Sequence, residues 1–167
     1  ITCLAADANG ALAIGLDRQG LLLRGGTYDG RRIEFAKALP LHCPTAALFL
    51  DADTLIVSVG SADFSATQWK HDLMARGASG SIWRIDLKNG GAQSLAQGLA
   101  FPYGLALTNN GALLVTEAWE HRIVEIGLHG GTPRPVLEEL PAYPARLTRA
   151  TDGGYWLTMF APRNPLI

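Results

Sequence analysis

Short apolar segments alternate with polar turns along this chain, and the same order recurs four times. Each recurrence has an apolar stretch, a turn rich in Asp, Asn or Gly, and a second stretch rich in Leu, Val, Ile or Trp. The four pairs of stretches occupy residues 1–16, 44–59, 102–118 and 143–160. Apolar stretches of strand length that flank such turns predict β-hairpins rather than helices.

The turns supply the period of the repeat. They share small or polar residues and lie at Asn9-Gly10, Asp53, Asn110-Gly111 and Asp152-Gly153. Asn-Gly and Asp-Gly tolerate positive φ at both central positions of a hairpin turn, so we expect tight two-residue turns. Successive turns are 43, 58 and 42 residues apart. A unit of about 40–45 residues with four strands is typical of a β-propeller blade.

An insertion at residues 61–79 explains the longer second interval, and its pattern is helical. Ser65 followed by Gln68 has the spacing of a capping box. Trp69 and Leu73 are four residues apart and would form a small apolar face on a helix. The remaining strands of the units are predicted at 20–23, 31–35, 81–86, 92–95, 121–126 and 134–137.

We therefore predict an all-β chain that forms a β-propeller fragment of about three and a half four-stranded blades with a short helical insertion. The blades are expected at residues 1–39, 40–98, 99–140 and 141–167, of which the last is incomplete. A partial ring exposes blade edges. The chain is expected to be a truncated part of a ring, with completion of the ring by another chain as the alternative, and its open edges could support self-association.

Composition narrows the classes of partner. The residues are 48% apolar and 17% charged, with a net charge of −1, which indicates a folded chain without the basic stripe of a nucleic-acid-binding protein. The apolar stretches are too short to span a bilayer, and no signal peptide is visible, so the sequence assigns no compartment. Cys3 and Cys43 are interpreted as buried small hydrophobic residues, with a disulfide as the alternative.

The repeat also predicts where a ligand would bind. The innermost strand of each propeller blade lines a central channel, and ligands bind at one mouth of that channel. The inner strands begin at Thr2, Thr45, Tyr103 and Ala145. A calcium site needs several converging carboxylate, amide or carbonyl oxygens. None of these four side chains is a carboxylate or an amide, so the blades are poorly equipped to hold calcium.

Five residues are candidates for a pocket that holds a small-molecule ligand or substrate. Tyr103 lines the channel by position in the repeat, and the adjacent Arg146 could bind a carboxylate or phosphate. The alternative is that both residues merely fill the channel. His42 precedes an inner strand and could carry a proton. Trp69 could cover the pocket or dock the helix, and Tyr143 lies near the start of the fourth inner strand.

Other residues have structural interpretations. Glu117 and Arg122 are predicted to form an ion pair that braces neighbouring strands. General acid catalysis by Glu117 is the alternative and would need burial to raise its pKa. Trp83, Trp119 and Trp156 are expected to pack between blades. No catalytic residue is assigned.

Three stretches resemble the strictosidine synthase-like branch of the propellers, in the superfamily of SMP-30/gluconolactonase and paraoxonase-type hydrolases. They are GSIWRIDL (80–87), GLAFPYGLALTNNGALLVTEAWEHRIVEI (98–126) and LPAYPARLTRATDGGYWLTMFAPRNPL (140–166). The resemblance implies a six-bladed ring and an enzyme that acts on a small organic substrate, with ester or lactone hydrolysis expected first. One alternative is a non-catalytic propeller that binds a small ligand or a protein. The second is a strictosidine synthase-type enzyme that condenses an amine with an aldehyde.

The sequence differs from the family pattern at two positions where the resemblance implies calcium ligands. The family usually has Asn where this chain has Tyr103, and that Asn is a calcium ligand in the metal-dependent relatives. The family tends to read Pro-Asp-Asn or Pro-Asp-Gly where this chain has Pro144-Ala145-Arg146. The resemblance thus implies calcium, while Tyr103 and Ala145 occupy two of its expected ligand positions. The catalytic glutamate of the plant synthases falls in a blade beyond Ile167.

Overall fold

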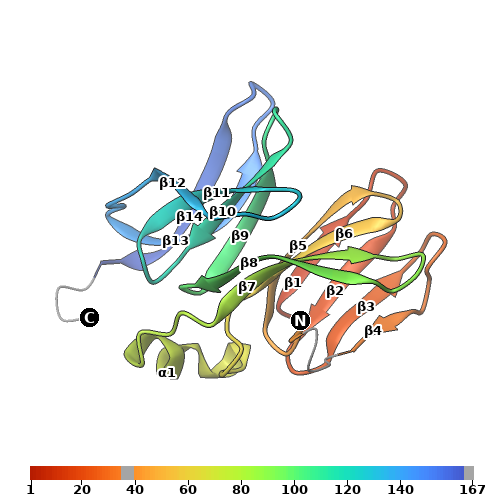
Figure 1. Ribbon diagram of the computed structural model, residues 1–167, viewed down its shortest axis with the longest axis horizontal. Helices are drawn as coiled ribbons and strands as arrows, with labels where there is room; N and C mark the ends of the chain where they lie inside the picture. Colours follow the sequence, from red (N-terminus) through yellow and green to blue (C-terminus); the bar gives the residue numbers. More distant parts are fainter. Residues whose placement is uncertain (35–39, 164–167) are drawn as a thin grey trace.

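Four antiparallel sheets account for most of the computed structural model, which describes residues 1–34 and 40–163 (Figure 1). The first sheet contains β1 (Cys3–Ala6), β2 (Leu12–Leu16), β3 (Gly20–Arg24) and β4 (Arg32–Ile33). The second contains β5 (Pro44–Asp51), β6 (Thr54–Val59), β7 (Gly80–Asp86) and β8 (Ala92–Leu99). The third contains β9 (Pro102–Leu107), β10 (Ala112–Glu117), β11 (Arg122–Gly127) and β12 (Arg134–Leu137). The fourth contains β13 (Ala142–Arg149) and β14 (Tyr155–Pro162).

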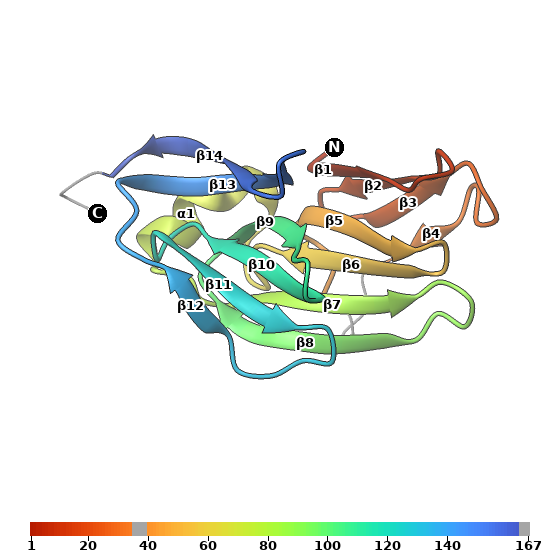
Figure 2. The same cartoon turned by 90° about the horizontal axis from the view of Figure 1, so that it is seen from above.

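Within each sheet, every strand pairs with the strand that follows it in the sequence. The first strands of neighbouring sheets contact one another, β1 with β5, β5 with β9, and β9 with β13. Figure 2 shows these strands on the inner side, with β8 and β12 on the outer side. This is the arrangement of propeller blades around an axis, so the predicted fold class is confirmed. Phe35 at the end of one predicted strand, the predicted blade boundary at residue 39, and residues 164–167 of the last predicted blade lie outside the described residues.

The predicted hairpins form, but three of their turns differ from the expectation. Only the glycine of each turn has positive φ, at 85° for Gly10, 76° for Gly111 and 89° for Gly153. The N–H of each glycine donates to the carbonyl three residues earlier, at 3.3 Å in the Gly10 turn. The expectation of two-residue turns with two positive φ values is therefore wrong for these hairpins. They use a longer turn in which a left-handed glycine restores the pairing.

The side chains of strand β6 pack against two neighbouring blades. Leu55, Ile56 and Val57 are all fully buried. Leu55 and Val57 belong to a core cluster shared with the first sheet, whereas Ile56 belongs to a cluster shared with the third. Successive side chains of a strand point to opposite faces, so a blade covered on both faces needs a continuous apolar run.

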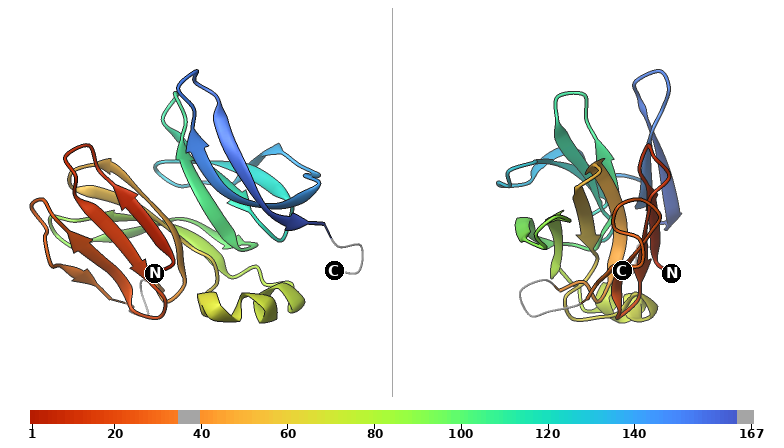
Figure 3. Two further views of the ribbon diagram at one scale, coloured as in Figure 1. Left: turned by 180° about the vertical axis from the view of Figure 1, so that it is seen from behind. Right: turned by 90° about the vertical axis from the view of Figure 1, so that its right-hand side faces the viewer.

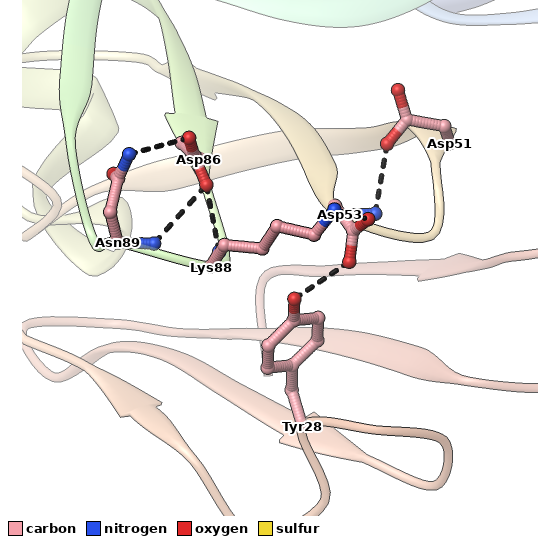
Figure 4. Close-up of polar contacts among 6 residues, drawn as sticks. All are labelled: Tyr28, Asp51, Asp53, Asp86, Lys88 and Asn89. Atoms are coloured by element: carbon pink, nitrogen blue, oxygen red, sulfur yellow. Dashed lines mark hydrogen bonds and ion pairs between the residues drawn. The ribbon is translucent and has the colours of Figure 1, made fainter.

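Polar side chains join the first two blades near the hairpin between β5 and β6 (Figure 4). The Tyr28 hydroxyl donates to Asp53 Oδ1 at 2.7 Å, and Lys88 Nζ lies 2.8 Å from Asp53 Oδ2. The hydrogen bonds from Lys88 and Tyr28 lower the pKa of Asp53. Because Lys88 is exposed, its ion pair with the partly buried Asp53 contributes little to stability.

The tryptophans predicted to pack between blades do not behave alike. Trp83 is 8% exposed and belongs to the core shared by the first two blades. Trp156 on β14 is 72% exposed, because no sheet of the described residues covers its face, so its packing between blades stays a prediction. Trp119 borders a cavity. Cys3 and Cys43 are buried and free, as interpreted from their surroundings.

The insertion between β6 and β7 forms the short helix η1 (Ala66–Gln68) followed by α1 (Trp69–Met74). The backbone N–H of Ser65 donates to Gln68 Oε1 at 3.3 Å, as the predicted capping box requires. Figure 3 shows α1 at the end of the sheets opposite the hairpin turns. Within the described residues, neither helix is long and apolar enough to cross a membrane.

Candidate functional site

A cavity of about 350 Å³ lies at the end of the sheets where the inner strands begin. All four sheets and the helical insertion contribute to its wall. The lining includes five aromatic side chains, which are Trp69, Phe101, Tyr103, Trp119 and Phe160. Its polar groups include Thr2, Asp17 and Thr45. The size and the mostly apolar wall are typical of a site for a small organic molecule.

The aromatic rings of the cavity form a continuous series. Phe101 stacks on Trp119, with ring centroids 4.5 Å apart and an interplanar angle of 25°. Tyr103 also stacks with Phe101, with ring centroids 6.0 Å apart and an interplanar angle of 29°. Trp69 lies 6.2 Å from Trp119 and meets Phe160 edge-on at 5.1 Å. Such pairs hold one another in place and present flat faces to a ligand.

The indole of Trp119 is fixed by the helical insertion. Its Nε1–H donates to Asp72 Oδ2 at 2.6 Å, and Asp72 is only 1% exposed. Gly77 makes room for this carboxylate, because a Cβ at Gly77 would lie 2.4 Å from Asp72 Oδ1. The hydrogen bond therefore links α1 to the residue that follows β10 and sets the position of one cavity wall.

Asp17 joins the insertion to the first blade. Its Oδ1 accepts the N–H of Ala66 at 2.8 Å, and the neighbouring Arg18 donates from Nη2 to Ser65 Oγ at 3.1 Å. These contacts hold the start of η1 against the first sheet. Asp17 is the only carboxylate among the described residues that line the cavity.

Arg146 lies behind Tyr103, with its guanidinium carbon 4.4 Å from the centre of that ring. Nη1 donates to the carbonyl oxygens of Thr45 and of Tyr103, the latter at 3.2 Å. Nη2 donates to the carbonyl oxygen of Thr2 at 2.9 Å. Three of the five guanidinium N–H groups are thus used by main-chain carbonyls. Binding of a carboxylate or phosphate by Arg146 stays a prediction.

The structure brings some of the predicted pocket residues together and separates others. Trp69 and Tyr103 both line the cavity, and Arg146 contacts Tyr103 from behind. Tyr143 is buried behind the wall, with its ring 5.9 Å from that of Trp119. His42 is partly buried just before β5 and does not line the cavity.

Sequence reasoning did not identify Trp119, Phe160 or Asp17 as cavity residues. Trp119 is predicted to pack between blades, whereas its stack on Phe101 lies within the third blade and its indole lines the cavity. The Asp72 side chain that anchors Trp119 is 47 positions away in the sequence. No spacing along the chain indicates such a contact.

Glu117 and Arg122 form an ion pair, with Arg122 Nε 2.6 Å from Glu117 Oε2. Glu117 is fully buried, and its Oε1 accepts the N–H of Ala100 at 2.9 Å. The hydrogen bond with Glu117 raises the pKa of Arg122. The pair connects β10 to β11 and holds the segment before Phe101, and neither partner lines the cavity.

The donor groups at this channel mouth do not fit calcium. The inner strands begin with two threonines, a tyrosine and an alanine, so no carboxylate or amide side chain is supplied there. The carbonyl oxygens of three of these residues are bonded to Arg146, which is itself a cation. Across residues 1–34 and 40–163, no group of three or more His, Cys, Asp or Glu side chains is arranged to hold a metal ion.

Comparison with known sequences shows similarity to the strictosidine synthase family. Residues 49–126 match the sequence model of the strictosidine synthase family. The adipocyte plasma membrane-associated protein of Danio rerio is 28% identical over 141 residues, which cover 81% of this chain and 32% of that protein. The chain spans about a third of the length of the curated relatives that it matches first.

Comparison with solved structures supports the fold. Virginiamycin B lyase from Staphylococcus aureus superposes with a TM-score of 0.68 at 19% identity, over 95% of this chain and 48% of that one. A gluconolactonase from Xanthomonas campestris also gives 0.68, at 16% identity, over 93% of this chain and 55% of that one. At these identities the likeness concerns the fold alone. By sequence the chain is similar to the strictosidine synthase family, and by structure it is part of a β-propeller.

Proposed function

We propose that this chain forms part of the substrate pocket of an enzyme that acts on a small organic molecule, with hydrolysis of an ester or lactone as the reaction. The observation that carries the proposal is the cavity of about 350 Å³ with its series of five aromatic rings at the channel mouth. Among proteins of similar fold, one is a gluconolactonase, which favours lactone chemistry.

The wall of the cavity suits a substrate with a flat or apolar body. The rings of Tyr103 and Trp119 line the cavity and are only partly buried, so their accessible surfaces can contact such a body. Asp17 is the carboxylate placed to accept a proton from water. In this scheme the water oxygen bonds to the acyl carbon, Asp17 takes the proton, and that proton passes to the leaving alcohol oxygen as the ester C–O bond breaks.

The full-length protein, offered a panel of aryl esters and lactones, tests this proposal. Asp17→Asn should lower kcat by about 100-fold or more with little change in KM, because it removes the proton acceptor. Trp69→Ala should raise KM by about tenfold, since it removes one aromatic face from the pocket. Trp156→Ala is the matched control, because that indole does not line the cavity, and it should leave both constants unchanged. Absence of turnover, or turnover indifferent to Asp17→Asn, would contradict hydrolysis by this site.

A second candidate function is non-catalytic binding of a small ligand. It is favoured by the chemistry of the lining: within the described part of the chain no His, Cys or Lys borders the cavity, and Asp17 already accepts the Ala66 N–H. Under this alternative, a cavity ligand would change tryptophan fluorescence in a saturable manner while no ester or lactone is consumed.

A further inference from the structure

Main-chain carbonyls from three blades converge on one cation at the channel mouth. Thr2, Thr45 and Tyr103 begin the first three inner strands, and the carbonyl oxygen of each accepts an N–H from the guanidinium of Arg146. Arg146 itself comes from the fourth inner strand, β13. One side chain therefore bonds to the three other inner strands at equivalent positions.

The second and third sheets are irregular near Thr45 and Tyr103, which leaves main-chain carbonyls free to accept these bonds. The pairing of β5 with β6 shifts register between Pro44 and Ala46, on either side of Thr45. The pairing of β9 with β10 shifts in the same part of the blade, between Val115 and Glu117, opposite Tyr103. A bulge takes backbone groups out of the ladder, and a buried carbonyl without a donor is costly. The carbonyl of Thr45, a residue that is 1% exposed, therefore requires a donor or a cation.

Arg146 meets that requirement without a carboxylate partner. One face of its guanidinium lies against the Tyr103 ring, at 4.4 Å, in a cation–π contact. In the part of the chain that the structure describes, Arg146 forms no ion pair with Asp or Glu. Its charge is balanced by carbonyl dipoles and by the ring.

We propose that Arg146 is a tethered cation that takes the place of a metal ion at this mouth. Converging carbonyl oxygens are ligands for hard cations such as calcium. A guanidinium hydrogen-bonded to the same oxygens excludes such an ion and links four inner strands. Arg146 thus adds a second cause for the lack of fit between calcium and this site, beside the missing carboxylate and amide side chains. The inference concerns the integrity of the channel mouth and is independent of the proposed hydrolysis.

Thermal unfolding of the full-length protein tests the proposal. Arg146→Ala should lower Tm by about 3 °C or more, because three carbonyls lose a charged donor. Millimolar calcium or methylguanidinium should restore part of that loss in Arg146→Ala and leave the wild-type Tm unchanged. Arg149→Ala is the control, since Arg149 is exposed on the same strand and bonds to Asn109; it should show neither the loss nor the restoration.

Three results would overturn the proposal. One is an Arg146→Ala protein as stable as the wild type. Another is a destabilised variant that neither cation restores, and the third is a wild type that calcium stabilises as much as the variant. If Arg146→Ala does not fold, it is refolded from urea with and without methylguanidinium or calcium. Recovery with either cation supports the proposal, and no recovery with both rejects it.

Discussion

Trp119 and Arg146 support neighbouring parts of the cavity wall by different means. Trp119 is held through a hydrogen bond from its indole N–H to the buried carboxylate of Asp72. Arg146 supports Tyr103 through the ring face and through main-chain carbonyls. In both cases the functional position of an aromatic ring depends on a charged residue that does not line the cavity.

Cys43 offers a pH-dependent test at the scale of a single residue. Its thiol is fully buried, and burial raises its pKa to about 12. The unfolded thiol ionises near about pH 8.5, so above that pH the unfolded state loses a proton that the folded state keeps. The free energy of unfolding should therefore be unaffected below that value and should fall as pH rises toward 12.

Urea unfolding at several alkaline pH values measures this effect, with Cys43→Ala as the comparison. The wild type should lose stability with pH more steeply than Cys43→Ala does. Both native thiols should also react slowly with a thiol reagent until the protein is unfolded. Equal pH slopes for the two proteins, or rapid labelling of both native thiols, would be inconsistent with this burial.

Strand β9 illustrates a constraint at the scale of elements. Gly104 lies where β9 approaches β13, and a Cβ there would lie 2.3 Å from the carbonyl oxygen of Ala145. Because the obstacle is backbone, a side chain would separate two inner strands. Gly104→Ala should reduce the free energy of unfolding by about 2 kcal/mol or more.

Chemical denaturation of Gly104→Ala checks this expectation, with Gly154→Ala as the control. At Gly154 the nearest atom to a new Cβ is the Asp152 carboxylate at 3.2 Å, which is the end of an exposed side chain and can move. The control should lose much less stability than Gly104→Ala. Equal and small losses in the two variants would show that the inner strands have room to separate.

Strand boundaries show what a sequence pattern can and cannot specify. β12 begins and ends as predicted, at Arg134–Leu137. β8 continues to Leu99, beyond the predicted end at residue 95, because its ladder with β7 includes Gln97 opposite Ser81. A polar residue and Gly98 interrupt the apolar pattern there, but backbone pairing does not require apolar side chains.

For the whole molecule, the repeat was sufficient to predict the blades and to group Thr2, Thr45 and Tyr103 at one mouth. Arg146 contacts all three, which shows that these equivalent positions are neighbours in space. The sequence places a pocket at this mouth with Tyr103 and Trp69, but the full wall of the cavity could not be predicted, because it depends on where the helical insertion docks. That placement rests on contacts such as Asp17 with Ala66, which the period of the blades does not encode.

Tryptophan fluorescence during titration of the full-length protein with an aryl lactone tests most directly whether the aromatic cavity binds the substrate. The double variant Trp69→Phe/Trp119→Phe should abolish most of the ligand-induced change, because these two indoles line the cavity, and Trp156→Phe should retain it, because Trp156 does not. A saturable signal that persists in the double variant and disappears in Trp156→Phe would place the ligand outside the cavity and contradict the proposed site.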